Sequence, residues 1–451
     1  MSEPARLTLV LRFADVGIAT YGSLRIVGQP SRTATWVVEE PILLAALQEL
    51  TDALPEPHGT ESRRDAIERA LATGPFAAAN TELTLAYILG VLLIGPVGWQ
   101  LLQECVTSPR ATLFVSPSAR LARVPWGLLA VPKSGPSKEE LVRARQEAIT
   151  TSGRTAARIP WQLTDINDHT DGHRLMELVD VLMAVPPNIV HSPRAPAGWD
   201  DRCDGPPALV LDPRVPGQRP DSALGSVLGR PLPENPLAQH FAELMQGRPV
   251  LPRVNAAVEL FRRQDADRIW LAKLLAQKPS RLMYVGHASS AEGHSADGAA
   301  LHLACPATIP GGADAIGEHR PLTASDLMSL QLPMPPRAAL LACGSGGDYR
   351  FDEATGLVAA MILGGAQVVT ATLWSLPTTA AYRQFAAATD APPDPMADLV
   401  IAVDRAHEAA DAGCAVNRWQ RAQMRRWRDG DVTASPLYWG ALVTFAVDGA
   451  R

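Results

Sequence analysis

The chain has 451 residues, enough for two or three domains with sizeable hydrophobic cores. Hydrophobic residues make up 47% of it and charged residues 20%, as in ordinary globular proteins. The net charge of −6 argues against a dedicated nucleic-acid-binding surface. The five cysteines have no regular spacing, so we predict no disulfide framework. Because the first residues also lack a signal-peptide pattern, we expect a cytoplasmic protein.

The first 105 residues predict an α+β region. Residues 6–13 and 22–27 have the apolar and β-branched content of strands, and residues 41–54, 61–72 and 81–104 are predicted helices. Residues 83–102 are uncharged over nearly the length of a membrane span. Three glycines and Pro96 interrupt this segment, and no basic cluster flanks it. We therefore interpret it as a buried core helix that Pro96 ends.

Residues 106–205 lead to a break in the pattern. Residues 111–116 are a predicted strand, and the charged residues 133–154 are predicted to form a solvated loop and helix. Residues 193–207 are rich in Pro, Gly and Asp, and we place the main domain boundary there.

Strands and helices alternate after the break. The predicted strands are 208–212, 281–286, 301–304, 338–342, 367–374 and 441–446. The predicted helices are 236–246, 266–277, 323–330, 353–363, 379–389 and 396–412. This alternation predicts an α/β fold with a mostly parallel sheet and helices on both faces.

Two of these strands end on reactive side chains, His287 and Cys343. Parallel strands place their carboxyl ends at one edge of the sheet, so an imidazole and a thiol would meet there. A neighbouring imidazolium lowers the pKa of a thiol, and the same group can protonate a leaving amine. The glycines after Cys343 let backbone N–H groups approach an oxyanion. Taken singly, the Cys could be a buried apolar residue and the His a structural one. Their joint occurrence favours a catalytic pair.

Acidic residues near this edge offer a substrate-binding role. Asp212 ends the strand 208–212, and Asp348 and Asp352 follow the cysteine loop. A carboxylate there would favour Arg or Lys in a substrate. The alternatives are an Asp-Pro turn for Asp212 and a helix N-cap for Asp352.

Two other clusters have weaker patterns. The spacing of His287, His294, His302 and Cys305 matches no compact zinc motif, so we predict no metal, and no cofactor is expected. A basic and aromatic cluster near the C-terminus could bind phosphates or an acidic partner. Its members are Trp419, Arg421, Arg425, Arg426, Trp427 and Arg428. We favour a solvated loop whose tryptophans cover the sheet edge.

From about residue 110 onward, a set of blocks resembles the CHAT peptidases, caspase-like cysteine proteases of the separase and metacaspase clan. The blocks are residues 124–129, 209–213, 284–287, 341–346, 363–374 and 436–441. The resemblance implies a caspase-like three-layer sandwich, with a peptidase domain at 206–451. Residues 106–205 would be the N-terminal part of the CHAT-like region, a degenerate caspase-like half, and residues 1–105 have no counterpart.

The resemblance also assigns roles to the site residues. It implies that His287 is the general acid/base and Cys343 the nucleophile. Backbone N–H groups of Cys343 and Ala288 would form the oxyanion site, although the clan often has Gly where Ala288 stands.

Two functions follow from this reading. The first is a cysteine endopeptidase that cleaves a specific protein partner and is regulated by a protein or ligand; no membrane or nucleic-acid partner is expected. The second is a caspase-like scaffold or interaction module without turnover, within a multi-protein system such as a bacterial conflict or defence system. A scaffold needs neither His287 nor Cys343, so their joint presence favours the enzyme.

Overall fold

The computed structural model describes residues 6–107, 110–133, 138–151, 163, 165–185, 189, 198–219, 222–291, 295–350, 356–386 and 394–447. The chain divides into two compact units. Unit 1 comprises Met1–Ala184, Phe385–Ala387 and Gln420–Gly440, and unit 2 comprises Val185–Gln384, Ala388–Trp419 and Ala441–Arg451. Unit 1 therefore includes residues on both sides of the domain limit predicted near residue 105.

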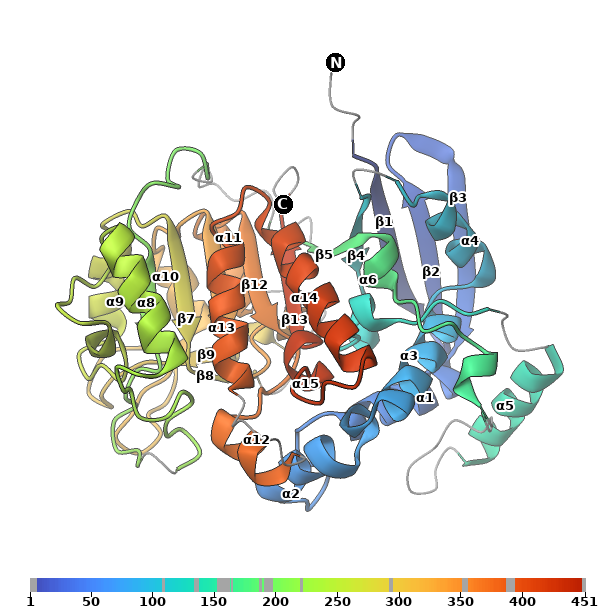
Figure 1. The fold of residues 1–451 in the computed structure, drawn as a ribbon, viewed down its shortest axis with the longest axis horizontal. Helices are drawn as coiled ribbons and strands as arrows, with labels where there is room; N and C mark the ends of the chain where they lie inside the picture. Colours follow the sequence, from blue (N-terminus) through green and yellow to red (C-terminus); the bar gives the residue numbers. More distant parts are fainter. Residues whose placement is uncertain are drawn as a thin grey trace. The chain divides into compact units, whose positions relative to one another are not determined.

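The strands of unit 1 follow the order β3-β2-β1-β4-β5 (Figure 1). They are β1 (Thr8–Val16), β2 (Ala19–Ile26), β3 (Gln29–Glu39), β4 (Thr112–Ser116) and β5 (Asp180–Ala184). β1, β2 and β3 pair antiparallel in sequence, whereas β4 pairs parallel with β1 and β5. The strands predicted at 6–13, 22–27 and 111–116 are confirmed as β1, β2 and β4.

β3 was not predicted, and its composition explains why. It begins with Gln29, Pro30, Ser31 and Arg32, which are turn-forming or polar residues. Only its second half, from Thr35 to Val38, is rich in β-branched and aromatic residues. Pro30 is tolerated because β3 is at the end of the strand order.

The apolar segment at residues 83–102 is part of the helical region of unit 1. They are α1 (Glu40–Ala53), α2 (Arg63–Glu68), α3 (Ala79–Leu93), α4 (Pro96–Glu104), α5 (Lys138–Thr151), α6 (Leu175–Leu178) and α15 (Pro436–Trp439). Pro96 is the first residue of α4, so the helix does end before it as predicted. Most of α3 is buried, which confirms a core role. In the described residues no single helix could cross a membrane; only α3 and α4 taken together pass by length and composition, and they are bent by 99°.

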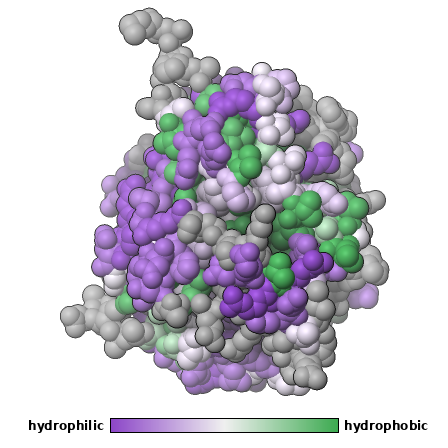
Figure 2. All heavy atoms as spheres, turned by 90° about the vertical axis from the view of Figure 1, so that its right-hand side faces the viewer, coloured by the Kyte–Doolittle hydropathy of each residue, from purple (hydrophilic) through white to green (hydrophobic). Residues whose placement is uncertain are grey.

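The surface of unit 1 carries small groups of exposed apolar side chains. Figure 2 views the side with β3 and α4 and shows a largely hydrophilic face interrupted by small apolar groups. The exposed apolar residues of this unit include Val16, Ile18, Tyr21, Val37 and Val97. Tyr21 and Val37 are partners across β2 and β3, and exposed apolar residues in such small numbers are normal in globular proteins.

Unit 2 is built on strands in the order β13-β12-β11-β7-β6 (Figure 1). They are β6 (Ala208–Leu211), β7 (Arg281–Val285), β11 (Arg337–Leu341), β12 (Val368–Thr372) and β13 (Leu442–Ala446). All neighbours pair parallel except β12 and β13, which are antiparallel. These strands are almost wholly buried, as parallel strands covered on both faces must be. The predicted α/β class with a mostly parallel sheet is confirmed.

A small antiparallel sheet follows β7 along the chain. It consists of β8 (His287–Ser289), β9 (Ala300–His302) and β10 (Leu322–Thr323), in the order β10-β9-β8. The predicted hairpin strand at 301–304 is confirmed as β9.

The helices of unit 2 lie in the connections between the strands of its sheet. They are α8 (Pro236–Gly247), α9 (Arg268–Leu275), α10 (Ala324–Leu330), α11 (Leu357–Leu363), α12 (Thr379–Phe385) and α13 (Pro395–Ala406). α8 and α13 lie over the face of the sheet that Figure 1 turns to the viewer, and His240 of α8 bonds to Asp404 of α13. α10 begins with a capping box in which Thr323 and Asp326 satisfy each other's backbone N–H groups, as its sequence indicates.

The interpretation of the C-terminal basic cluster as a loop is wrong. Residues 412–428 form a helix, α14 (Ala412–Arg428). Arg421 is 4% exposed and donates to Asp180 and to the carbonyl of Met176, and Trp427 is buried. Arg428 pairs with Glu177. Arg421 and Trp427 are therefore internal, whereas the other three arginines are exposed, and Arg421, Arg426 and Arg428 have acidic partners in their own chain.

Candidate active site

The backbone at His287 is fixed by the strand that precedes it. The ring of Tyr284 folds back over Gly286, where a Cβ atom would lie only 2.8 Å from the tyrosine oxygen. The Tyr284 hydroxyl donates to the carbonyls of His287 (2.7 Å) and His302 (3.1 Å). Gly286 is therefore required for this close approach, and the tyrosine ties the end of β7 to β9.

Cys343 lies in a tight turn after β11, the Cys343 turn (residues 342–347). Gly344 has a φ of +60°, which favours glycine, and Ser345 N–H donates to the carbonyl of Ala342. The Ser345 hydroxyl donates to the carbonyl of Leu340 (2.6 Å) and accepts from the N–H of Thr372 in β12 (3.1 Å). Ser345 is 2% exposed, so it is a structural link between the turn and β12.

Strand pairing brings the two reactive side chains to one edge. β7 and β11 are parallel neighbours, and Val285 pairs with Leu341 at their carboxyl ends. His287 lies two residues after Val285 in the sequence, and Cys343 lies two residues after Leu341. Since adjacent strands lie about 4.8 Å apart, the chain leaves β7 toward His287 and β11 toward Cys343 at the same edge of the sheet. The His287 side chain is buried, whereas that of Cys343 is partly exposed.

A backbone carbonyl fixes the tautomer of His287. Its Nε2 lies 3.1 Å from the carbonyl oxygen of Gly225. A carbonyl only accepts, so Nε2 carries a proton and donates it. In the neutral imidazole, Nδ1 is then the nitrogen that carries no proton.

A pair of histidines, His302 and His319, lies next to His287. His302 pairs with His287 across β8 and β9, and its Nδ1 lies 3.0 Å from Nε2 of His319. The carbonyl of Cys305 accepts from Nδ1 of His319, so the proton between the imidazoles is on His302. Burial, with the neighbouring His319 and His287, lowers the pKa of His302 to about 3. His302 is therefore neutral and adds no charge beside His287.

Asp212 lies directly after β6, the neighbour of β7, but its carboxylate is shielded from solvent by its own chain. It has no exposed surface, and its φ is +50°. Oδ2 accepts from the Ser226 hydroxyl (2.7 Å) and the N–H groups of Val227 (3.1 Å) and Leu228 (3.3 Å). Oδ1 lies 3.3 Å from Nη1 of Arg262. The predicted counter-charge role toward a substrate stays a prediction, and the structure already supplies an arginine to this carboxylate.

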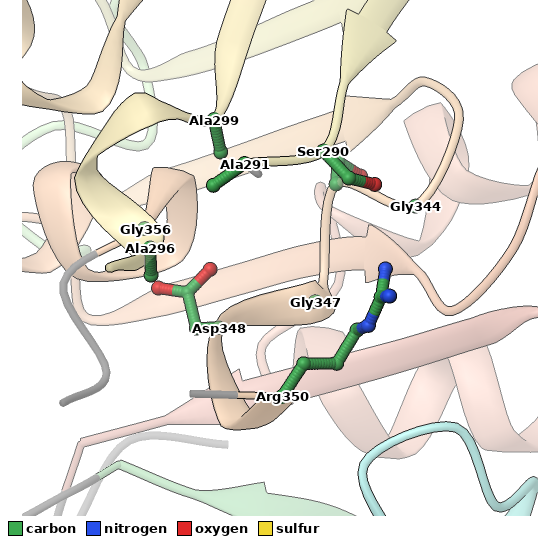
Figure 3. A pocket seen from close by; sticks show the side chains of 10 residues that line it. Ser290, Ala291, Ala296, Ala299, Gly344, Gly347, Asp348, Arg350 and Gly356 are labelled. Atoms are coloured by element: carbon green, nitrogen blue, oxygen red, sulfur yellow. The ribbon is translucent and has the colours of Figure 1, made fainter. Parts of the chain in front are cut away.

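Asp348 lies by a pocket that adjoins the Cys343 turn (Figure 3). Small residues such as Ala291, Ala299 and Gly344 line most of it, and Asp348 and Arg350 are its charged members. The Asp348 carboxyl accepts from N–H groups at the start of α11, of Val358 (3.3 Å) and Ala359 (2.8 Å). Burial raises its pKa to about 6, against the opposing effect of these hydrogen bonds. Asp352 lies outside the described residues.

The two predicted oxyanion donors lie on either side of this edge. Ala288 is the second residue of β8, and Cys343 follows β11.

Of the free cysteines, Cys105, Cys305 and Cys414 are buried, and only Cys343 and Cys203 are partly exposed. In the described residues, which do not include His294, no group of three His, Cys, Asp or Glu could hold a metal ion.

A family model for the CHAT domain matches residues 85–447. The chain belongs to the CHAT family. No curated protein matches it. Two crystal structures of the Saccharomyces cerevisiae separase–securin complex, at 3.0 and 2.6 Å resolution, are similar with a TM-score of 0.39 and 11% identity. Each comparison covers 98% of this chain and 30% of the separase chain.

Membership of the CHAT family accounts for the blocks seen in the sequence and gives the chain a caspase-like protease fold. The match begins within α3, whereas the sequence resemblance begins at about residue 110. The sequence did not indicate Gly225 or Arg262: Gly225 contributes a carbonyl, which no side-chain pattern reveals, and Arg262 is ordinary in sequence until the fold brings it beside Asp212. His302 was considered only with His287, His294 and Cys305 as a possible zinc ligand, and its pairing with His287 across β8 and β9 was not predicted.

Proposed function

We propose that this CHAT protein is a cysteine endopeptidase that cleaves a protein partner with Cys343 as nucleophile and His287 as general acid/base. The observation that carries the proposal is the pairing of β7 with β11, which puts both residues the same distance beyond the Val285–Leu341 pair. The Gly225 carbonyl supports it further, because a donor bond at Nε2 leaves Nδ1 to exchange the proton.

The chemistry follows from these two groups. The Cys343 thiol gives its proton to Nδ1 of His287, and the thiolate attacks the carbonyl carbon of the scissile amide. The carbonyl oxygen becomes an oxyanion, for which the N–H groups of Ala288 and Cys343 are the proposed donors. When the C–N bond breaks, His287 gives the proton to the amine. Water then hydrolyses the thioester, and the thiol and neutral imidazole are restored.

The pocket beside the Cys343 turn is the proposed site for a substrate side chain. It adjoins Gly344, the residue after the proposed nucleophile, and Asp348 and Arg350 are its charged lining residues (Figure 3). We further propose that a protein partner or a ligand relieves an inactive resting state, since an unrestrained protease would cleave proteins around it.

Cys203 makes a labelling test internally controlled. The protein is treated with iodoacetamide at pH 7, and the alkylation of Cys343 and Cys203 is followed by peptide mass spectrometry. Both cysteines are partly exposed, so accessibility is comparable, and only Cys343 has an imidazole on the adjacent strand. We expect Cys343 to react at least about tenfold faster than Cys203. A peptidyl chloromethyl ketone library should label Cys343 alone.

The same ratio tests the role of His287. In His287→Ala the advantage of Cys343 over Cys203 should disappear, and cleavage of amide substrates should slow by about two to four orders of magnitude. A wild-type ratio near one that His287→Ala does not change would overturn the peptidase proposal and favour the interaction module without turnover.

A further inference from the structure

The Gly225 carbonyl that orients His287 lies in a segment without helix or strand. This segment, the Gly225 loop (residues 222–229), comes between β6 and α8. A carbonyl in such a loop would not hold a fixed position on its own, since loops are the more mobile parts of a fold. Other contacts must therefore fix it if the imidazole is to keep one tautomer.

Asp212 supplies most of these contacts. Its Oδ2 accepts hydrogen bonds from the hydroxyl of Ser226 and from the N–H groups of Val227 and Leu228. These are the three residues that follow Gly225. Asp212 is itself tied to the catalytic edge, because its N–H donates to the carbonyl of Val285 at the end of β7 (2.6 Å). Its left-handed backbone conformation, a strained one for a residue other than glycine, is held by these bonds.

Arg262 connects the carboxylate to the carbonyl. Its Nη1 donates to the carbonyl oxygen of Gly225 (2.9 Å) and lies 3.3 Å from Oδ1 of Asp212. The backbone N–H of Arg262 donates to the carbonyl of Leu211, the last residue of β6. The Gly225 oxygen thus accepts from the guanidinium and from Nε2 of His287, which uses both of its lone pairs.

We propose that Asp212 and Arg262 are positioning residues for His287, which hold the Gly225 carbonyl against the imidazole and balance each other's charge beside it. This inference rests on the proposed function. It replaces the substrate-binding role predicted for Asp212 with a role inside the catalytic machinery. Asp212 and Arg262 differ from an ordinary buried ion pair because Arg262 also donates to the Gly225 carbonyl, the group to which His287 donates. Both charges therefore lie near the imidazole.

The charges around His287 decide what each variant should do. From β9 it faces His302, which is neutral because burial lowers its pKa, and from β7 the phenol of Tyr284, whose pKa is raised by burial. The guanidinium of Arg262 reaches the carbonyl oxygen to which the imidazole donates, and the carboxylate of Asp212 lies 3.3 Å from that guanidinium. The proposed thiol partner, Cys343, follows the adjacent strand β11. Removing the guanidinium leaves a negative charge, which favours imidazolium and disfavours thiolate. Removing the carboxylate leaves a positive charge, which does the opposite.

The experiment measures the rate of Cys343 alkylation by iodoacetamide from pH 5 to pH 9, with Cys203 as the reference. In Arg262→Gln the profile should move to higher pH, and in Asp212→Asn to lower pH, each on the order of one unit. The double variant should lie near the wild type, and Arg262→Lys, which keeps the charge, should lie closer to it than Arg262→Gln. Arg263→Gln is the matched control, because Arg263 pairs with the exposed Asp265 and should leave the profile unchanged.

A residue that merely stabilised the loop would move both profiles in the same direction, or lower the rate with no shift, and either result overturns the inference. A loss in Asp212→Asn that is confined to arginine-bearing chloromethyl ketones would also overturn it, in favour of substrate binding. In both cases fast alkylation of Cys343 in the wild type would leave the peptidase proposal standing. NMR titration of His287 in Cys343→Ala protein labelled with ¹⁵N-histidine gives the same two opposite shifts without the thiol, and no shift there contradicts the inference.

Discussion

The strands β7 and β11 have polar groups at both ends, and the two ends differ in how these groups are satisfied. At the amino ends Arg281 and Arg337 are paired neighbours and both buried. Arg281 bonds to Asp404 of α13 (2.7 Å), and Arg337 donates to the carbonyls of His407 (2.7 Å) and Ala410 (2.8 Å). Every one of these contacts comes from unit 2 itself, and the two guanidiniums lie under α13 and the turn that follows it.

The carboxyl ends are held by different means. There the Cys343 turn and the His287 backbone are fixed through carbonyls and hydroxyls, by Ser345 and Tyr284, and the Cys343 side chain remains partly exposed. At the amino ends the two strands therefore carry buried guanidiniums held by a carboxylate and by carbonyl groups, and at the carboxyl ends they lead to a buried imidazole and a partly exposed thiol. We expect the buried charged groups to stabilise the fold, and we expect chemistry at the end where a thiol is accessible.

Cys343→Ala is the change expected to have the largest effect on function and little effect on the fold. Loss of the nucleophile removes the covalent route, so cleavage should fall by at least about four orders of magnitude. The lost sulfur is partly exposed, so the free energy of unfolding should change by only about 1 kcal/mol. Cleavage of a fluorogenic peptide-amide library and urea unfolding measure the two effects. Cleavage retained by a folded variant would contradict the assignment.

Asp404→Ala, at the amino ends of β7 and β11, should strongly lower the free energy of unfolding and leave the reactivity of Cys343 unchanged. It leaves the buried Arg281 guanidinium without its principal carboxylate, which costs on the order of 3–5 kcal/mol. Glu408→Ala is the matched control, because Glu408 contacts the same Arg281 but is 39% exposed, and its loss should cost less than about 1 kcal/mol. Urea unfolding gives both values. At temperatures where Asp404→Ala is folded, the ratio of Cys343 to Cys203 alkylation should equal that of the wild type; a changed ratio would show that the two ends are not independent.

Asp348 and Asp404 should respond to pH with opposite signs. Burial raises the pKa of Asp404, but the charge and hydrogen bonds of Arg281 and His240 outweigh it, so the pKa lies below the usual value. Its stabilising contribution is present above about pH 4 and lost on acidification. Asp348 has no such counter-charge among its hydrogen-bond partners, and burial raises its pKa from 3.8 to about 6. The folded state then binds more protons than the unfolded state, so stability falls as pH rises from about 4 to 6 and is level above that range.

Asp348→Asn tests this sign. The difference in unfolding free energy between the wild type and Asp348→Asn should fall by up to about 3 kcal/mol from pH 4 to pH 7, since each pKa unit corresponds to about 1.4 kcal/mol. The amide cannot accept at both of its terminal atoms, so the variant should be the less stable protein at pH 4. A difference that is constant with pH would mean that Asp348 titrates normally in the folded protein.

The sequence predicted the architecture of unit 2 well because its strands are short apolar runs ending at glycine, serine or a reactive residue. His287 and Cys343 could be proposed for the same reason: a polar side chain at the end of such a run is conspicuous. The Gly225 carbonyl, Arg262 and His302 could not, since their roles depend on loop and cross-strand contacts that have no sequence period. β3 and α14 were missed because polar residues dominate much of them, and tertiary contacts such as that of Arg421 with Asp180 decide their structure.

Ser345→Ala is expected to have the smallest effect and shows how the carboxyl end is held. The change leaves the N–H of Thr372 without the hydroxyl acceptor and removes the donor to the carbonyl of Leu340, both in a buried setting. Leaving such groups unsatisfied costs about 1–3 kcal/mol in unfolding free energy. Because the turn is then less firmly tied to β12, the alkylation ratio of Cys343 to Cys203 should also fall by a few fold. Ser290→Ala is the control: Ser290 lies near Gly344 in the same pocket but is exposed, and its loss should change neither quantity. Equal effects of the two substitutions would mean that the turn does not depend on Ser345, and the distinction between the two strand ends would then rest on His287 and Tyr284 alone.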